Sequence, residues 1–97
     1  MAVKIIITRT FKDANLKDAQ AMLIQARSNA MREKGYISSE TLASMDNPAK
    51  KVVLTMWQTR EDWENYKNSP ARQENERKYS EILEGETEYE VFNMGMG

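Results

Sequence analysis

The chain has 97 residues, of which 40% are hydrophobic and 30% charged, and its formal net charge is -1. This length predicts a single domain over residues 1–97 that buries only about 60 to 65% of the surface exposed by the unfolded chain, so we expect it to need a partner. The near-zero charge, with lysines and arginines scattered among acidic residues, disfavours nucleic-acid binding. No apolar run approaches the roughly 20 residues that cross a bilayer, and no signal-peptide pattern is found, so we expect a cytoplasmic protein without a membrane role.

The chain contains no cysteine and no histidine. Their absence from the sequence excludes thiol chemistry, disulfides, imidazole bases and the usual zinc sites, and leaves carboxylates as the only metal ligands. The glycines are isolated, so no glycine-rich phosphate loop is predicted. We therefore expect a protein with no cofactor and no metal.

The first half of the chain predicts a strand followed by a helix. In the strand Val3 to Thr10, one side carries Val3, Ile5, Ile7 and Arg9, and the other carries Lys4, Ile6, Thr8 and Thr10. Asp13 or Asn15 is expected to cap a helix that runs to about Lys34 and has an apolar stripe. Gly35 suits the left-handed conformation that ends such a helix.

Two further strands are predicted next. Residues Tyr36 to Met45 form a polar segment typical of a sheet edge, and Asp46-Asn47-Pro48 predicts the turn of a hairpin. The strand from Lys51 to Thr59 that follows is largely apolar on both faces.

Two capped helices and a last strand complete the chain. Thr59 is placed to accept a hydrogen bond from the backbone of Asp62 at the start of a helix that carries Trp63 and Tyr66 on one face. Ser69 as N-cap and Pro70 at the first helical position predict a second helix, in a segment that ends at Gly85. In the strand from Glu86 to Met94, alternating glutamates are predicted to protect an exposed sheet edge.

The order βαββαβ predicts an α+β, ferredoxin-like fold, with a four-stranded antiparallel sheet and the helices on one face. In such a sheet the uncovered face normally alternates with polar residues, but the first and third strands are apolar on both sides. We therefore expect a homodimer in which a second copy covers the open face.

The segment after the third strand resembles the antibiotic biosynthesis monooxygenase family. The matching residues are Met56-Trp57-Gln58-Thr59, Glu61-Asp62-Trp63 and Asn68-Ser69-Pro70-Ala71-Arg72. The resemblance extends more loosely, by element order, over nearly the whole chain. It implies a ferredoxin-like protein that assembles as a dimeric α/β barrel.

Several residues are candidates for a pocket between the sheet and the helices. Trp57, Trp63 and Tyr66 either line such a pocket or simply fill the core, and the pattern favours neither strongly. Thr8 and Arg9 are polar residues between isoleucines, which a pocket would explain. Arg72 and Arg77 lie five residues apart, so only one is expected to point inward, where it would stabilise an oxyanion. The pattern favours a solvated arginine paired with nearby glutamates over this role.

The resemblance adds roles to these residues. Quinone-forming members of the family oxidise polycyclic phenols with O₂ and no cofactor, and by position Trp57, Trp63 and Arg77 fall at their catalytic residues, whereas Val53 replaces their strand asparagine. The haem-degrading members carry other residues where this chain has Thr8, Tyr66 and Glu76, so we expect no haem binding.

Two functions remain open from the sequence. The first is a cofactor-independent monooxygenase acting on a small electron-rich aromatic such as a hydroquinone or polyphenol. Its predicted catalytic residues are Trp57, Trp63 and Arg77, and its predicted substrate-binding residues are Thr8, Arg9, Tyr66 and Arg72. The alternative is a non-catalytic dimeric module that binds a small hydrophobic ligand or serves as a structural partner.

Overall fold

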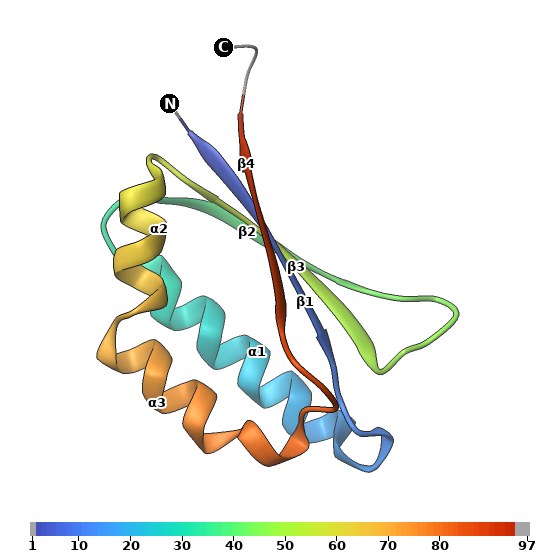
Figure 1. Cartoon of the computed structure of the whole chain (residues 1–97). Coiled ribbons are helices and arrows are strands. Elements are labelled where there is room, and N and C mark those ends of the chain that lie inside the picture. The colour runs from blue at the N-terminus through green and yellow to red at the C-terminus, as the bar shows by residue number, and fades with distance from the viewer. Residues whose placement is uncertain (1, 95–97) are drawn as a thin grey trace.

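The computed structural model describes residues 2–94 and has the predicted ferredoxin-like α+β fold (Figure 1). The strands are β1 (Val3–Thr10), β2 (Tyr36–Ala43), β3 (Lys50–Trp57) and β4 (Glu88–Asn93). The helices are α1 (Leu16–Met31), α2 (Arg60–Lys67) and α3 (Pro70–Lys78), and short 3₁₀ turns cover Asp13–Asn15 and Ser80–Ile82. Within residues 2–94 no helix is long and apolar enough to cross a membrane.

The four strands form one antiparallel sheet in the order β2-β3-β1-β4. In the centre, Ile5 of β1 lies opposite Thr55 of β3 and Val91 of β4. The predicted edge position of the polar second strand is confirmed, and β4 forms the other edge with Glu88 and Glu90 exposed. The hairpin between β2 and β3 extends away from the helices (Figure 1).

Both predicted caps in the second half of the chain are confirmed. The Thr59 hydroxyl accepts from the backbone N–H of Asp62 at 3.0 Å, and the Ser69 hydroxyl accepts from that of Arg72 at 3.3 Å. Pro70 occupies the first position of α3, where its missing N–H removes no helical hydrogen bond. These caps fix where α2 and α3 begin and hence which residues they direct toward the sheet.

The predicted cap at the start of α1 is wrong. Neither Asp13 nor Asn15 makes a side-chain capping bond. The chain instead enters the helix through a 3₁₀ turn, in which the backbone N–H of Asn15 donates to the carbonyl of Lys12 at 2.9 Å. The helix also ends at Met31 rather than near Lys34, because three turn residues precede Gly35.

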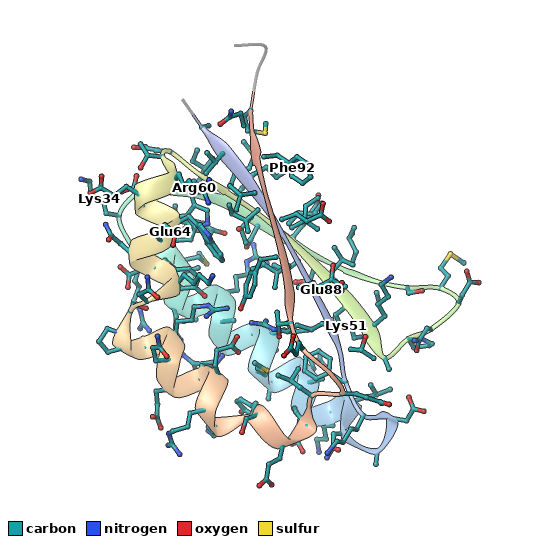
Figure 2. All side chains as sticks on the ribbon, viewed as in Figure 1. Lys34, Lys51, Arg60, Glu64, Glu88 and Phe92 are labelled. Atoms are coloured by element: carbon teal, nitrogen blue, oxygen red, sulfur yellow. The ribbon has the colours of Figure 1, made fainter. Side chains whose placement is uncertain are left out.

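The two faces of the sheet differ strongly in burial. All three helices lie on one side (Figure 1), and on that side Val3, Ile5, Ile7 and Arg9 are buried. The opposite face carries a group of apolar side chains that no helix or strand of residues 2–94 covers. These residues, named the open face below, are Ile6, Val52, Leu54, Met56 and Phe92. Phe92 is 46% exposed and points away from the helices (Figure 2).

Two groups of buried side chains form the core between the sheet and the helices. The larger contains Val3, Ile5, Ile7, Ala30, Trp57, Trp63 and Tyr66, and the smaller contains Phe11, Ala19 and Met22. The larger cluster therefore holds three of the predicted site residues together with the helix-facing side of β1.

The fold predicts a large cost for a side chain at Gly35. Its φ is +87°, and a Cβ atom there would lie 2.2 Å from the Asp62 carboxylate oxygen, so Gly35→Ala combines backbone strain with a steric overlap. Gly85 has a similar φ of +79° but open space around it, which makes Gly85→Ala the matched control. In urea unfolding we expect Gly35→Ala to lose about 1 to 3 kcal/mol more than Gly85→Ala. Equal losses of unfolding free energy in the two variants would show that the Asp62 side chain can move away from the new methyl group at no energetic cost.

Candidate functional site

A cavity lies between the helix-facing side of the sheet and helices α1 and α3. Its volume is about 30 Å³, which holds one or two water molecules. Most of the exposed wall is apolar, and polar residues from every helix and from β1, β2 and β3 also line it. They include Arg9, Tyr66, Arg72, Asn75 and Glu76. The strand β1 and the helix α3 thus bring distant parts of the sequence to one site.

Two buried arginines share one carboxylate in this cavity. Arg9 Nη2 lies 2.5 Å from Glu76 Oε1, and Arg72 Nη2 lies 3.0 Å from the same oxygen. The side chains of Arg9 and Arg72 are only 4% and 9% exposed, and that of Glu76 is 23% exposed. Two positive charges against one negative charge leave an excess of positive charge at a poorly solvated place, where an anion is strongly attracted.

Three buried polar atoms of the site have no hydrogen-bond partner within residues 2–94. They are Arg9 Nε, Asn75 Oδ1 and Glu76 Oε2. Buried polar atoms are almost always paired with protein or with ordered water, so unpaired atoms beside a cavity indicate a polar occupant. One donor and two acceptors suit water molecules or the hydroxyl group of a ligand.

Arg72 is held in place by contacts with several elements. Its guanidinium donates to the Tyr89 hydroxyl on β4 and, through Nη1, to the carbonyl of Lys67 at 3.4 Å. It also lies 5.5 Å from the centre of the Tyr89 ring, and the Lys67 ammonium lies 4.5 Å from that centre. Fixing a cation in this way lets it stabilise charge without reorganising during a reaction.

Tyr66 provides a neutral hydroxyl at the cavity wall. Burial raises its pKa, and the nearby guanidinium groups of Arg72 and Arg9 oppose the rise only in part. Its hydroxyl donates to the Ala26 carbonyl on α1 at 3.2 Å, which requires the protonated form. Tyr66 therefore joins α2 to α1 as a neutral phenol at neutral pH.

The two tryptophans lie behind this wall. Trp57 and Trp63 are 0% and 1% exposed, and the cavity lining includes neither. The Trp57 ring stacks on the Tyr66 ring at 5.0 Å, and its indole N–H donates to the Thr55 hydroxyl at 3.1 Å. Their predicted catalytic roles stay predictions, and the structure places them as packing that orients Tyr66.

The structure brings three predicted residues together and separates two others. Arg9, Tyr66 and Arg72 line the cavity. Thr8 pairs with Val52 and Glu88 and therefore faces the opposite side of the sheet. Arg77 is 72% exposed and pairs with Glu74 on the outer surface of α3. The site roles predicted for Thr8 and Arg77 stay predictions that this geometry does not support.

Sequence reasoning did not identify Asn75 and Glu76 as parts of this site. Glu76 follows Arg72 by four residues, a spacing that places both on one face of α3. Asn75 is 5% exposed, and its amide donates to the Met22 carbonyl on α1 at 3.2 Å. The spacing of Arg72 and Glu76 was a usable signal, whereas nothing in the local sequence indicates that Asn75 is buried.

The site offers little to a metal ion. Across residues 2–94 no three acidic side chains come close enough to hold a cation. The carboxylate in the cavity lining, Glu76, is already shared by Arg9 and Arg72. The donors of the site suit an anionic or hydroxylated organic ligand instead.

The burial of Tyr66 predicts an alkaline dependence of stability. Because folding raises its pKa, the neutral phenol stabilises the folded state below the unfolded pKa of about 10, and this contribution is lost as the pH rises through the higher folded value. Near-ultraviolet titration should show a late-ionising phenol in the wild type that Tyr66→Phe lacks. If Tyr66→Phe instead removes a phenol that ionises at the ordinary pKa, burial does not raise the pKa of Tyr66 and the prediction is wrong.

The fold is shared with solved structures of low sequence identity. A conserved protein from Methanosarcina mazei Go1 has a TM-score of 0.87 at 18% identity over 95% of this chain and 91% of its own. A protein from Mycobacterium tuberculosis has a TM-score of 0.87 at 16% identity over 100% and 98%. SnoaB, a cofactor-independent oxygenase from Streptomyces nogalater, has a TM-score of 0.85 at 12% identity over 99% and 95%. At these identities the likeness shows the fold alone.

Sequence comparison assigns the family directly. A search of curated proteins gives no significant match. The sequence profile described as antibiotic biosynthesis monooxygenase matches residues 2–78, which is most of the chain and includes every element from β1 to the end of α3. The chain therefore belongs to the antibiotic biosynthesis monooxygenase family.

Proposed function

We propose that this protein is a cofactor-independent monooxygenase that oxidises a small electron-rich aromatic, such as a hydroquinone or polyphenol, with O₂. The observation that carries the proposal is the excess positive charge of Arg9 and Arg72 over Glu76 beside a cavity, with Arg9 Nε still unpaired among the described residues. Family membership supports a monooxygenase-type reaction. The protein named as a cofactor-independent oxygenase shares this fold.

The proposed chemistry needs an ionised substrate. A phenol that enters the site would lose its proton more readily because a phenolate is stabilised by the two guanidinium groups. The phenolate is the electron donor to O₂: one oxygen atom enters the ring, the other leaves as water, and the hydroquinone becomes a hydroxyquinone. All the electrons for this reduction come from the substrate, so the residues serve to bind it, orient it and stabilise its charge.

The size of the cavity sets a condition on this proposal. About 30 Å³ accommodates water but no aromatic ring, so side chains at the rim have to move when a substrate enters. The exposed Arg27 and half-buried Leu23 of α1 line this cavity and are the side chains that have to move, although Leu23 also packs against the Phe11, Ala19 and Met22 cluster. The tight packing of this cavity favours, as a second candidate, the non-catalytic dimeric module in its role as a structural partner.

We propose further that the protein is a homodimer whose interface is the open face. Ile6 and Leu54 lie opposite each other at its centre, and in the next row of the same face Met56 and Phe92 flank Lys4. Uncovered apolar side chains grouped in this way mark association surfaces. Sheet-to-sheet packing of two copies would bury them.

Sedimentation at micromolar concentration tests the dimer. We expect a species of twice the 11.2 kDa chain mass, and we expect Leu54→Glu to give a folded monomer because a charge at the centre of the open face would be buried without a partner. Met31→Glu, on the exposed side of α1, is the control and should remain dimeric. A wild-type monomer, or a dimer unaffected by Leu54→Glu, would remove the proposed interface.

Oxygen uptake with a panel of hydroquinones tests the activity. Removing the buried cation by Arg72→Gln should lower kcat/KM by about 100-fold, a typical loss for one charge-stabilising donor. Arg77→Gln removes a charge from the solvent-exposed side of the same helix and should leave the rate unchanged. Thermal unfolding should show both variants folded. No oxygen uptake with any hydroquinone would favour the non-catalytic candidate, and equal losses in both variants would contradict the site.

A further inference from the structure

A second, larger hollow lies outside the cavity described above. It is an open groove of about 490 Å³ between α1 and the ends of β2 and β3. We name it the α1–β2 groove; it is lined by Leu16, Gln20, Leu23, Ile24, Arg27, Thr41, Ala43 and Lys51. Its volume is in the range of small-molecule sites. Leu16 and Ile24, at its edge, are 36% and 63% exposed.

The groove adjoins the inner cavity. Leu23, Arg27 and Thr41 line both spaces, so their side chains form the wall that separates them. Lys51, labelled in Figure 2, lies opposite Arg9 in the pairing of β3 with β1, on the helix-facing side of the sheet. A ligand that reaches the inner arginines from this side therefore passes between Arg27 and Lys51.

The groove combines apolar walls with positive charge only. Arg27 and Lys51 are its charged residues, and neither forms an ion pair or a side-chain hydrogen bond with any residue of the described part of the chain. Arg60 and Arg77 have acidic partners, whereas Lys17 and Lys50, outside the groove, have none among the described residues, so the groove is distinguished by its shape and apolar lining together with its charge. Unpaired cations beside Leu16, Leu23 and Ile24 complement an apolar chain that ends in an anion.

We propose that the α1–β2 groove binds the carboxylate-bearing apolar side chain of the substrate. The substrate class is then a hydroxylated aromatic ring with a short alkyl chain that ends in a carboxylate. The ring occupies the inner cavity once Leu23 and Arg27 move, and the carboxylate lies between Arg27 and Lys51. The assignment of the ring rests on the proposed monooxygenase function, whereas binding of the carboxylate chain does not.

The test measures binding by calorimetry with two probes of equal length, 4-phenylbutanoate and its neutral analogue 4-phenylbutan-1-ol. We expect the wild type to bind the acid at least about tenfold more tightly than the alcohol at low salt, because the groove attracts the carboxylate. In Arg27→Gln/Lys51→Gln this preference should fall to near one. Neither probe can be oxidised as a hydroquinone, so the result is independent of turnover.

A charge-matched variant separates the groove from the general field of the protein. Lys17→Gln/Lys50→Gln removes the same charge from the same helix and strand, but neither residue lines the groove. It should keep the preference for the acid. Equal affinities for both probes in the wild type, or an equal loss of preference in both double variants, would overturn the proposal.

Sedimentation and oxygen uptake separate ligand binding in the groove from self-association and from turnover. If another copy of the chain covers the groove instead, only the Arg27→Gln/Lys51→Gln variant will sediment differently from the wild type, and its preference for the acid will be unchanged. This outcome would overturn the proposal. Oxygen uptake with a dihydroxyphenyl alkanoate and with its methyl ester tests the reaction separately. Oxygen uptake without a preference for the acid would overturn the proposed role of the groove and support the monooxygenase function. A preference for the acid in binding, without oxygen uptake, would support the groove and contradict the monooxygenase function.

Discussion

The site depends on one interaction, the contact of a single Glu76 oxygen with both Arg9 and Arg72. It connects the central strand β1 to helix α3, which are far apart in the sequence. Breaking such a contact by removing the carboxylate would leave two buried cations without a counter-charge, a change that costs several kcal/mol in other proteins. The same contact leaves the positive charge in excess, and the proposed binding of an anionic oxygen in the cavity rests on this excess.

The aromatic cluster supports this polar group from behind. Trp57 stacks on Tyr66, and Trp63 lies 6.0 Å from Tyr66, between ring centres. The Tyr66 hydroxyl is bound to the backbone of α1, so the ring cannot turn away from the cavity without losing a buried hydrogen bond. A rigid apolar wall next to fixed cations lowers the local dielectric response, which strengthens their effect on a bound phenolate.

Local signals predicted the fold well. Thr59 and Ser69 were identified as caps because a cap depends only on the residues within one helical turn. Alternation located β1 and the edge strand β4, and the polarity of β2 indicated the other edge. Asn15 was predicted wrongly because a 3₁₀ turn satisfies the same backbone groups without its side chain. The strand β3 begins one residue earlier and ends two residues earlier than predicted, although Thr59 keeps an extended backbone as the cap of α2.

The site was predictable only in part, because packing decides which face of an element is used. Arg72 and Arg77 differ by about 140° around the helix axis, and only the contact of α3 with β1 shows that Arg72 is the inner one. Periodicity identified Trp57 and Trp63 as inward-facing but did not separate a core position from a cavity wall. Asn75 and Tyr89 become parts of the site through tertiary contacts alone.

The main role proposed for the buried arginines is to stabilise an anionic oxygen in the cavity. Spectrophotometric titration of bound 4-nitrophenol measures this directly, because the phenol and the phenolate absorb differently. We expect binding to lower the pKa of the nitrophenol by about one unit or more, equivalent to about 1.4 kcal/mol, and Arg72→Gln to abolish the shift. A bound nitrophenol whose pKa is unchanged or raised would show that desolvation exceeds the charge of the arginines and would contradict this role.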